Sequence, residues 1–208
     1  FADIEGIRPG QQAGLFAESA GDVDGDGAED LLIGAFYALD EEEVGGSVCV
    51  VRGPVQGSTT LADADGCLVS GTGEHSPRYL SAPGDVDGDG LADLWVGWYD
   101  PREAEAWLVT QMPDGELSLE EAEARVTTAD GSLGLVDAGG DVDGDGMAEL
   151  LLRGAGPDGY SVALFFGPIR GEVLLEEADA TLGGVEAALG TDVAWGDADG
   201  DTHSDLLI

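Results

Sequence analysis

The sequence predicts an all-β fold, a β-propeller of four-stranded antiparallel blades, with about three and a half blades in this chain. Two observations lead to this class. An acidic segment with the pattern D-x-D-x-D-G-x-x-[D/E] occurs three times intact, starting at Asp22, Asp85 and Asp141, and a fourth time in weakened form at Asp197, at spacings of 63, 56 and 56 residues. Short apolar runs flank every copy. A period near sixty with several short strands per unit indicates a propeller blade or a β-solenoid coil, rather than a helical repeat.

The first unit contains four strand signals in a fixed order. A short strand at 14–20 leads into the acidic segment. The run at 31–36 (LLIGAF) is too uniformly apolar for a half-exposed strand, so we expect both of its faces to be buried. A third strand, at 47–52, comes after an acidic turn, and a fourth strand lies at 67–70.

The later units repeat this order. The predicted strands are 79–82, 94–98, 104–110 and 125–128 in the second unit, 133–138, 150–154, 161–166 and 180–182 in the third, and 189–196 and 206–208 in the fourth. One short helix is also predicted, at Leu117–Arg125 (LSLEEAEAR).

These signals describe a single domain over residues 1–208. The predicted blades cover about 11–72, 76–129 and 132–183, with a partial blade at 187–208, and residues 1–7 form the outer strand of a preceding or closing blade. The chain begins with Phe1 and no signal peptide, so we expect a mature or excised piece that is cut within the repeat at both ends.

Each acidic segment offers carboxylates at alternate positions and a further carboxylate at position 9, and in the first three segments a glycine stands at position 6. Such a loop can surround one hard cation with oxygen ligands, and calcium accepts six to eight oxygens in forgiving geometry. An EF-hand requires a glutamate at position 12 and flanking helices. Position 12 is apolar and lies within a predicted strand in every copy, which excludes EF-hands; the residues are Ile33, Val96, Leu152 and Ile208.

A strand, the acidic motif, an apolar strand and a pair of glycine and a small residue, repeated about every sixty residues, resemble the FG-GAP repeat of integrin α-subunit propellers, which also occurs in many bacterial secreted proteins. The best-kept part is GDVDGDG at 21–27, 84–90 and 140–146, followed by GDADGD at 196–201. The Phe-Gly pair is Leu-Gly at 133–134 and 189–190 and is lost in the first two units. Family propellers usually have seven blades, about twice the number in this chain.

The resemblance implies five calcium ligands in each loop: side-chain oxygens at positions 1, 3, 5 and 9, and the backbone carbonyl at position 7. In the order of positions 1, 3, 5, 7 and 9, these are Asp22, Asp24, Asp26, Ala28 and Asp30 in the first loop, Asp85, Asp87, Asp89, Leu91 and Asp93 in the second, Asp141, Asp143, Asp145, Met147 and Glu149 in the third, and Asp197, Asp199, Asp201, His203 and Asp205 in the fourth. We therefore expect three to four Ca²⁺ ions.

The third and fourth loops depart from the common pattern. Glu149 is one methylene longer than the aspartate it replaces, so the third site should hold calcium with altered geometry. Thr202 replaces the glycine at position 6, where a Cβ atom costs conformational energy. We expect the fourth site to be the weakest.

Cys49 and Cys67 are the two cysteines of the chain, and each lies in a predicted strand. Antiparallel neighbours would place them opposite one another and allow a disulfide in an oxidising compartment. The alternative is that they are two small buried apolar residues.

Charge and motif content limit the classes of function. A net charge of −37 repels nucleic acid and anionic membranes, so we expect neither as a partner. No run approaches 18 apolar residues, so membrane insertion is not expected. The sequence lacks a G-x-S-x-G elbow, a P-loop and an H-E-x-x-H motif, and neither His75 nor His203 is expected to act through its ring. For Trp95 and Trp98, core packing is favoured over stacking on sugars.

These observations favour a calcium-binding adhesion or protein-interaction module, extracellular or on a cell surface, that is not an enzyme. Its partner would be a protein or glycan on a cell surface. The alternatives are a carbohydrate-binding or polysaccharide-lyase-associated propeller and a purely structural spacer. Self-association is one further expectation, because two such chains would close a seven-bladed ring. The alternatives are a four-bladed ring within one chain, closed by the N-terminal strand joining the partial blade, and, if the chain is a fragment, closure by the missing blades.

Overall fold

A computed structural model describes residues 2–7, 12–35, 46–69, 76–99, 104–128, 133–156, 159–183 and 194–207. Strands dominate these residues, and the helices among them are three 3₁₀ turns of three residues each. The prediction of an all-β chain with several antiparallel sheets is confirmed. Parts of the predicted strands lie outside the described residues, namely Phe36, Ser70, 189–193 and Ile208.

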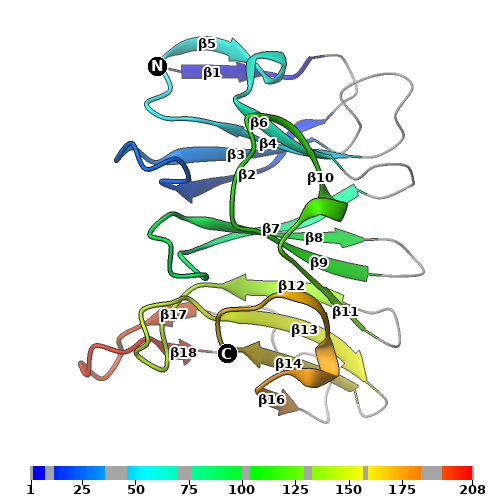
Figure 1. Cartoon of the computed structure of the whole chain (residues 1–208), viewed down its shortest axis with the longest axis vertical. Coiled ribbons are helices and arrows are strands. Elements are labelled where there is room, and N and C mark those ends of the chain that lie inside the picture. Colours follow the sequence, from blue (N-terminus) through cyan, green and yellow to red (C-terminus); the bar gives the residue numbers. More distant parts are fainter. Residues whose placement is uncertain are drawn as a thin grey trace.

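Three sheets are stacked one above another (Figure 1), and each has a part made of four antiparallel strands; the first two sheets also carry a fifth, parallel strand at the outer edge. In order of pairing, they contain β2 (Ala13–Gly21), β3 (Asp30–Ala35), β4 (Ser47–Val51) and β6 (Gly66–Val69); β7 (Ser76–Gly84), β8 (Asp93–Tyr99), β9 (Ala104–Val109) and β11 (Ala124–Thr127); and β12 (Leu133–Ala138), β13 (Leu150–Gly156), β14 (Gly159–Phe165) and β16 (Ala180–Gly183). A two-stranded antiparallel sheet, β17 (Ala194–Gly196) with β18 (Asp205–Leu207), follows the third of them.

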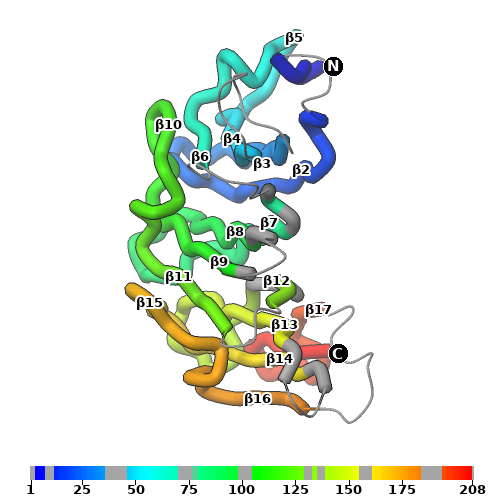
Figure 2. The backbone as a smooth tube through the Cα atoms, turned by 90° about the vertical axis from the view of Figure 1, so that its right-hand side faces the viewer, coloured from blue at the N-terminus to red at the C-terminus, as the bar shows by residue number. Residues whose placement is uncertain are grey.

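Short parallel strands that were not predicted link neighbouring units. They are β5 (Gly57–Thr60), β10 (Gly115–Ser118) and β15 (Gly171–Leu174), which lead into the turns η1 (Leu61–Asp63), η2 (Leu119–Glu121) and η3 (Leu175–Glu177). Strand β10 crosses to the preceding sheet and pairs with its outer strand β6, and β15 pairs with β11 in the same way (Figure 2). Strand β5 makes the equivalent parallel pair with β1 (Ala2–Glu5). We call β5, β10 and β15 the bridging strands.

The predicted helix at Leu117–Arg125 is wrong. This segment holds the end of β10, the turn η2 and the start of β11. Its glutamates and alanines favour a helix, but tertiary context overrides weak local propensity. Here the backbone of β10 pairs with β6, and Leu119 is buried between the first two sheets, so the chain gains more from an extended path with one 3₁₀ turn.

The core lies between the sheets, because the second strand of each sheet is apolar on both faces. Leu94 and Val96 of β8 pack with residues of the first sheet, whereas Trp95 packs on the other side with residues of the third. The expected two-sided burial of β3 is confirmed, since Leu32 and Ile33 enter different clusters. Trp95 is fully buried, in agreement with its prediction as a core residue, and the side chain of Trp98 lies outside the described residues.

Cys49 and Cys67 form a disulfide. They lie directly opposite one another on β4 and β6, with their Cα atoms 4.0 Å apart. The bond joins the third and fourth strands of the first sheet within a cluster that also contains Ile33 and Leu61. Of the two alternatives from the sequence, the covalent one is therefore present.

Replacement of Leu152 by alanine should lower the free energy of unfolding by about 2–5 kcal/mol, because this β13 side chain is fully buried between the second and third sheets. The control is Leu182→Ala on β16 of the same sheet, where 43% of the residue is exposed and the cost should stay below about 1 kcal/mol. Urea unfolding in saturating calcium measures both. Equal costs would contradict a core placed between the sheets.

Candidate metal sites in the acidic loops

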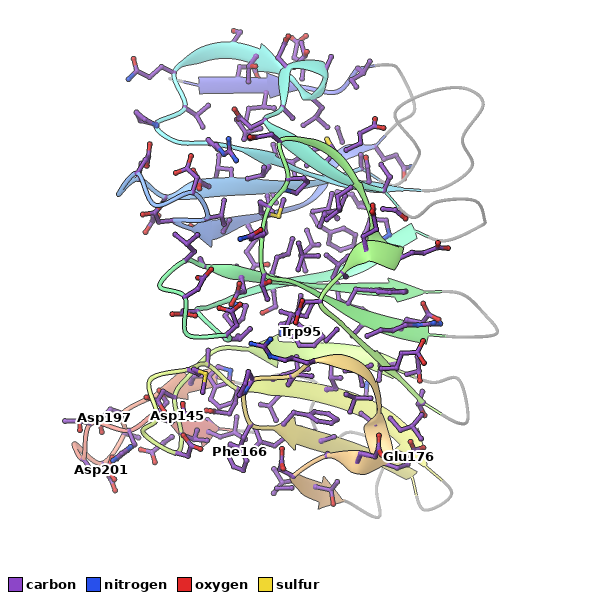
Figure 3. All side chains as sticks on the ribbon, in the orientation of Figure 1. Trp95, Asp145, Phe166, Glu176, Asp197 and Asp201 are labelled. Atoms are coloured by element: carbon purple, nitrogen blue, oxygen red, sulfur yellow. A yellow bond between two sulfur atoms is a disulfide. The ribbon has the colours of Figure 1, made fainter. Side chains whose placement is uncertain are left out.

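Each acidic segment joins the first two strands of a sheet. The first acidic loop (22–30) connects β2 to β3, the second (85–93) β7 to β8, the third (141–149) β12 to β13, and the fourth (197–205) β17 to β18. All four lie along one side of the stack, on the left in Figure 1. Figure 3 labels Asp145 of the third loop and Asp197 and Asp201 of the fourth, all on this side of the stack.

The carboxylate at position 1 organises the backbone of its loop. Asp22 Oδ1 accepts hydrogen bonds from the amides of Gly25 at 2.7 Å and Asp26 at 3.1 Å, and its Oδ2 accepts one from Gly27 at 2.9 Å. Desolvation raises the pKa of Asp22, but these hydrogen bonds to the charged form bring the pKa below its ordinary value. The equivalent bonds recur at Asp85, Asp141 and Asp197.

The turn at position 6 requires a left-handed backbone. Gly27 has φ of +87°, and Thr202 has φ of +78° at the same place in the fourth loop. A side chain with a Cβ atom is strained there. Thr202 still donates its amide to Asp197 Oδ2 at 3.0 Å, so the loop keeps its shape at a conformational cost. That the fourth site is the weakest stays a prediction.

The carboxylate at position 9 is the first residue of the second strand, or in the third loop the residue just before it, and it accepts a hydrogen bond from within the loop. Asp30, Asp93 and Glu149 are buried, and each accepts the amide at position 2 of its own loop, at 3.0, 2.6 and 2.6 Å respectively. Asp205 makes the same bond to Ala198 at 2.8 Å. The longer side chain of Glu149 therefore occupies the place of the aspartate it replaces.

The fold gathers carboxylate oxygens in every loop. Oxygens of positions 1, 3 and 9 lie within 4.8 Å of one another in the sets Asp22, Asp24 and Asp30; Asp85, Asp87 and Asp93; and Asp197, Asp199 and Asp205. In the third loop, Asp145 at position 5 joins Asp141, Asp143 and Glu149. The side chains of Asp26, Asp89 and Asp201 stand outside these sets and accept the amide at position 7. The predicted ligands are thus brought together for positions 1, 3 and 9, whereas the position 7 carbonyls of Ala28, Leu91, Met147 and His203 stay predictions.

The second and third loops each contain an unsatisfied buried carboxylate oxygen. Asp93 Oδ1 and Glu149 Oε1 are inaccessible to solvent and accept no hydrogen bond. Burial, followed by repulsion from the other loop carboxylates, raises the pKa of both groups to about 7, despite the opposing hydrogen bonds from Val86 and Val142. A buried acceptor without a partner is costly. A hard divalent cation would satisfy both the free oxygen and the excess charge, so these residues fit such an ion.

Neighbouring loops are joined to one another. The amide at position 8 donates to the position 1 carbonyl of the preceding loop, from Ala92 to Asp22 at 3.0 Å, from Ala148 to Asp85 at 3.0 Å and from Ser204 to Asp141 at 2.9 Å. The glycine at position 4 makes room for the next loop. A Cβ atom on Gly25 would lie 3.2 Å from Leu91 Cδ2, and one on Gly144 would overlap the ring of His203. The four loops therefore form one continuous stack, which the motif alone did not predict.

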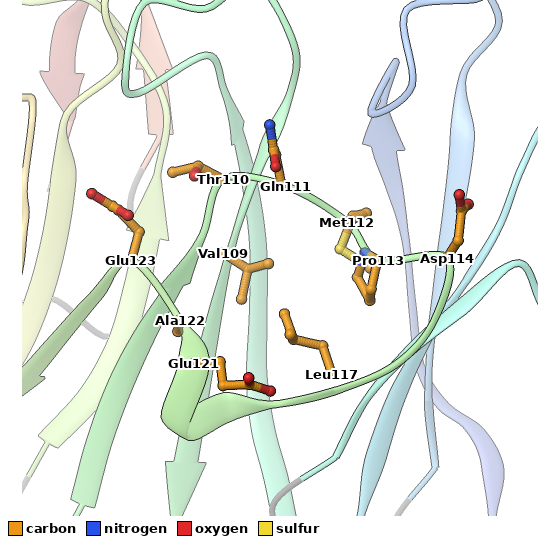
Figure 4. Close-up of a pocket in the computed structure, with 10 residues that line it drawn as sticks. All are labelled: Val109, Thr110, Gln111, Met112, Pro113, Asp114, Leu117, Glu121, Ala122 and Glu123. Atoms are coloured by element: carbon orange, nitrogen blue, oxygen red, sulfur yellow. The ribbon is translucent and has the colours of Figure 1, made fainter.

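A pocket of about 440 Å³ lies on the connection from β9 to β11 (Figure 4). Its wall includes the acidic side chains of Asp114, Glu121 and Glu123 around the apolar Val109 and Leu117. It was not predicted, since its residues carry no motif, and its acidic lining is suited to cations rather than anions.

Comparisons with known proteins support a resemblance to integrins over part of the chain. No family model matches. Integrin alpha-3 of Cricetulus griseus is 36% identical over 96 residues, which cover 44% of this chain and 9% of that protein. The chain is thus similar to an integrin α subunit over less than half of its own length. Among the described residues, no helix has the length and apolar character needed to cross a membrane.

Asp93→Asn should have opposite effects with and without metal. In chelator at pH 8, loss of a buried charge among like charges should raise Tm by about 2–8 °C, the shift that about 1–2 kcal/mol causes in a domain of this size. In calcium, the same variant should gain less stability than the wild type, because the second loop has lost a ligand. Thermal unfolding followed by circular dichroism measures both, with the exposed Glu116→Gln as control. A variant less stable than the wild type in chelator would contradict the electrostatic interpretation.

Proposed function

We propose that this chain is part of a calcium-stabilised β-propeller that serves as an extracellular or cell-surface adhesion and protein-interaction module. The observation that carries the proposal is the stack of four acidic loops, each at the same place in its sheet, in a chain similar to integrin alpha-3. The repeated four-stranded sheets are the blades of the proposed propeller. Self-association of such blades into a closed ring belongs to the same proposal.

Calcium is the proposed ion because every side chain in the gathered sets is a carboxylate, so the metal-binding atoms that they offer are oxygens. Ca²⁺ takes six to eight oxygens at flexible angles, whereas Mg²⁺ demands a nearly ideal octahedron and gives up its water reluctantly. The gathered carboxylates supply three or four side-chain oxygens around each site. Transition metals would favour histidine or cysteine, and among the described residues both cysteines are bonded to each other and none of the gathered sets includes a histidine.

The proposed role of the ion is mechanical. Close carboxylates repel one another by about 1–4 kcal/mol per pair at the surface of a protein. Each loop connects the first two strands of its blade, and the loops are hydrogen-bonded in succession, so neutralising one loop would stabilise the turns of neighbouring blades as well. Calcium would therefore govern whether the stack is rigid enough to present a binding surface.

The binding role is supported by the similarity to an integrin α subunit, and the disulfide is consistent with an oxidising, extracellular location. We propose a protein or glycan of a cell surface as the partner and no catalysis by the module itself. Loops between blades on the side away from the calcium loops would carry the contact surface.

Calcium should raise the melting temperature of chelator-stripped protein, with half of the effect near 10⁻⁴–10⁻³ M, the range of extracellular calcium modules. Magnesium at the same concentration should have a much smaller effect. Calorimetric titration in parallel should count three to four sites. A titration without binding heat, together with an unchanged melting temperature, would refute the metal role.

The adhesion role predicts that the immobilised protein captures intact cells in calcium and releases them in chelator. An array of extracellular proteins and an array of glycans, probed in calcium, would assign the partner to one of these two classes. The matched control is the protein carrying Asp87→Asn and Asp143→Asn, which removes one ligand from each of two loops. Calcium binding without capture of any cell, protein or glycan would leave a structural spacer as the function.

A further inference from the structure

The four acidic loops have nearly the same sequence, but the first has a cation of its own. Arg52 follows β4 directly, and its Nε lies 3.2 Å from Asp24 Oδ2, the carboxylate at position 3. The other end of the guanidinium donates from Nη1 to Asp114 Oδ1 at 2.8 Å, on the wall of the pocket in Figure 4. One positive side chain thus joins the first loop to the connection between β9 and β10.

The second and third sheets have no such charge at the equivalent position. The amide of Arg52 donates to Asp65 Oδ2 at 2.9 Å, and the amide of Phe166 donates to Asp179 Oδ2 at 2.9 Å, which establishes the equivalence of Arg52 and Phe166. In the second sheet, the residue that follows the third strand is Thr110. Threonine and phenylalanine cannot neutralise a loop carboxylate.

In the first loop, both oxygens of the buried carboxylate of Asp30 accept hydrogen bonds from backbone amides. Asp30 Oδ2 accepts the amide of Val23 at 3.0 Å, and Asp30 Oδ1 accepts the amide of Gly53 at 2.7 Å. By contrast, Asp93 Oδ1 and Glu149 Oε1 in the next two loops are buried without a hydrogen-bond partner. The second and third loops therefore contain an acceptor that a metal ion would complete, whereas the same acceptor in the first loop is already used.

We propose that Arg52 is the resident cation of the first acidic loop, and that this loop consequently binds Ca²⁺ about tenfold more weakly than the second and third loops do. The proposal rests on the proposed function, in which the loops bind calcium. Asp24 can ligate the ion with full charge only when Arg52 withdraws from it, because a guanidinium and a divalent cation repel each other at this distance. As the calcium concentration rises, the second and third loops bind Ca²⁺ first. Until the first loop binds its own ion, Arg52 neutralises part of its charge and holds its shape.

The test is a calcium titration of the whole chain, by calorimetry and by competition with a chromophoric chelator. Wild-type protein should show two tight sites followed by weaker binding. Arg52→Gln should convert one weak site into a third tight one, a gain of about tenfold in affinity. The matched control is Arg170→Gln, which removes the same charge from a side chain that faces Glu123 instead of a loop carboxylate, and should leave the titration unchanged.

A second pair of variants tests the proposal without altering Arg52. Asp24→Asn should leave both tight sites, whereas Asp87→Asn at the same position of the second loop should remove one of them. Three equal tight sites in the wild type, or loss of a tight site in Asp24→Asn, would overturn the inference while leaving the proposed function intact. Wild-type protein that binds no calcium would overturn both.

Discussion

Repulsion among carboxylates packed into a nine-residue loop is the constraint on which the arrangement of this chain depends. The aspartate at position 1 partly balances it by collecting backbone amides, as Asp22 does with Gly25, Asp26 and Gly27. The remaining oxygens converge, and in the second and third loops one of them is buried without a partner. A divalent cation is the natural complement of that geometry, and an arginine serves a similar purpose in the first loop.

Because hydrogen bonds join successive loops, the charge repulsion in one loop also affects the stability of the neighbouring loop. The amide at position 8 donates to the position 1 carbonyl of the preceding loop at all three junctions. At the outer edge of the first two sheets, the bridging strands β10 and β15 add a parallel partner to the fourth strand of the preceding sheet. Apolar clusters fill the space between these two connections. The first and second sheets, and likewise the second and third, are thus joined by a loop contact, an apolar core and a bridging strand.

The second strand of each sheet could be located from the sequence because its residues are apolar on both faces, which indicates burial on both sides. Runs such as LLIGA at 31–35 and LWVG at 94–97 contain no polar residue, so only a core on both sides suits them. The bridging strands were missed because GELS and GEVL are short and half polar, and their pairing partners lie in another unit. A repeated signal existed in the leucine turns that follow them, at 61–63, 119–121 and 175–177. Its meaning as a turn after a strand, rather than a helix, depends on contacts outside the segment.

The sequence by itself determined the all-β class, the repeat, the position of every acidic loop and the chemistry of its donors, because these follow from local composition and spacing. Tertiary structure alone decided that Cys49 meets Cys67, that the loops form one stack, and that Arg52 reaches both Asp24 and Asp114. The physical reason is the separation along the chain of the residues that interact. A loop's donors are neighbours along the chain, whereas Arg52 and Asp114 are 62 positions apart and meet only because one sheet packs on the next.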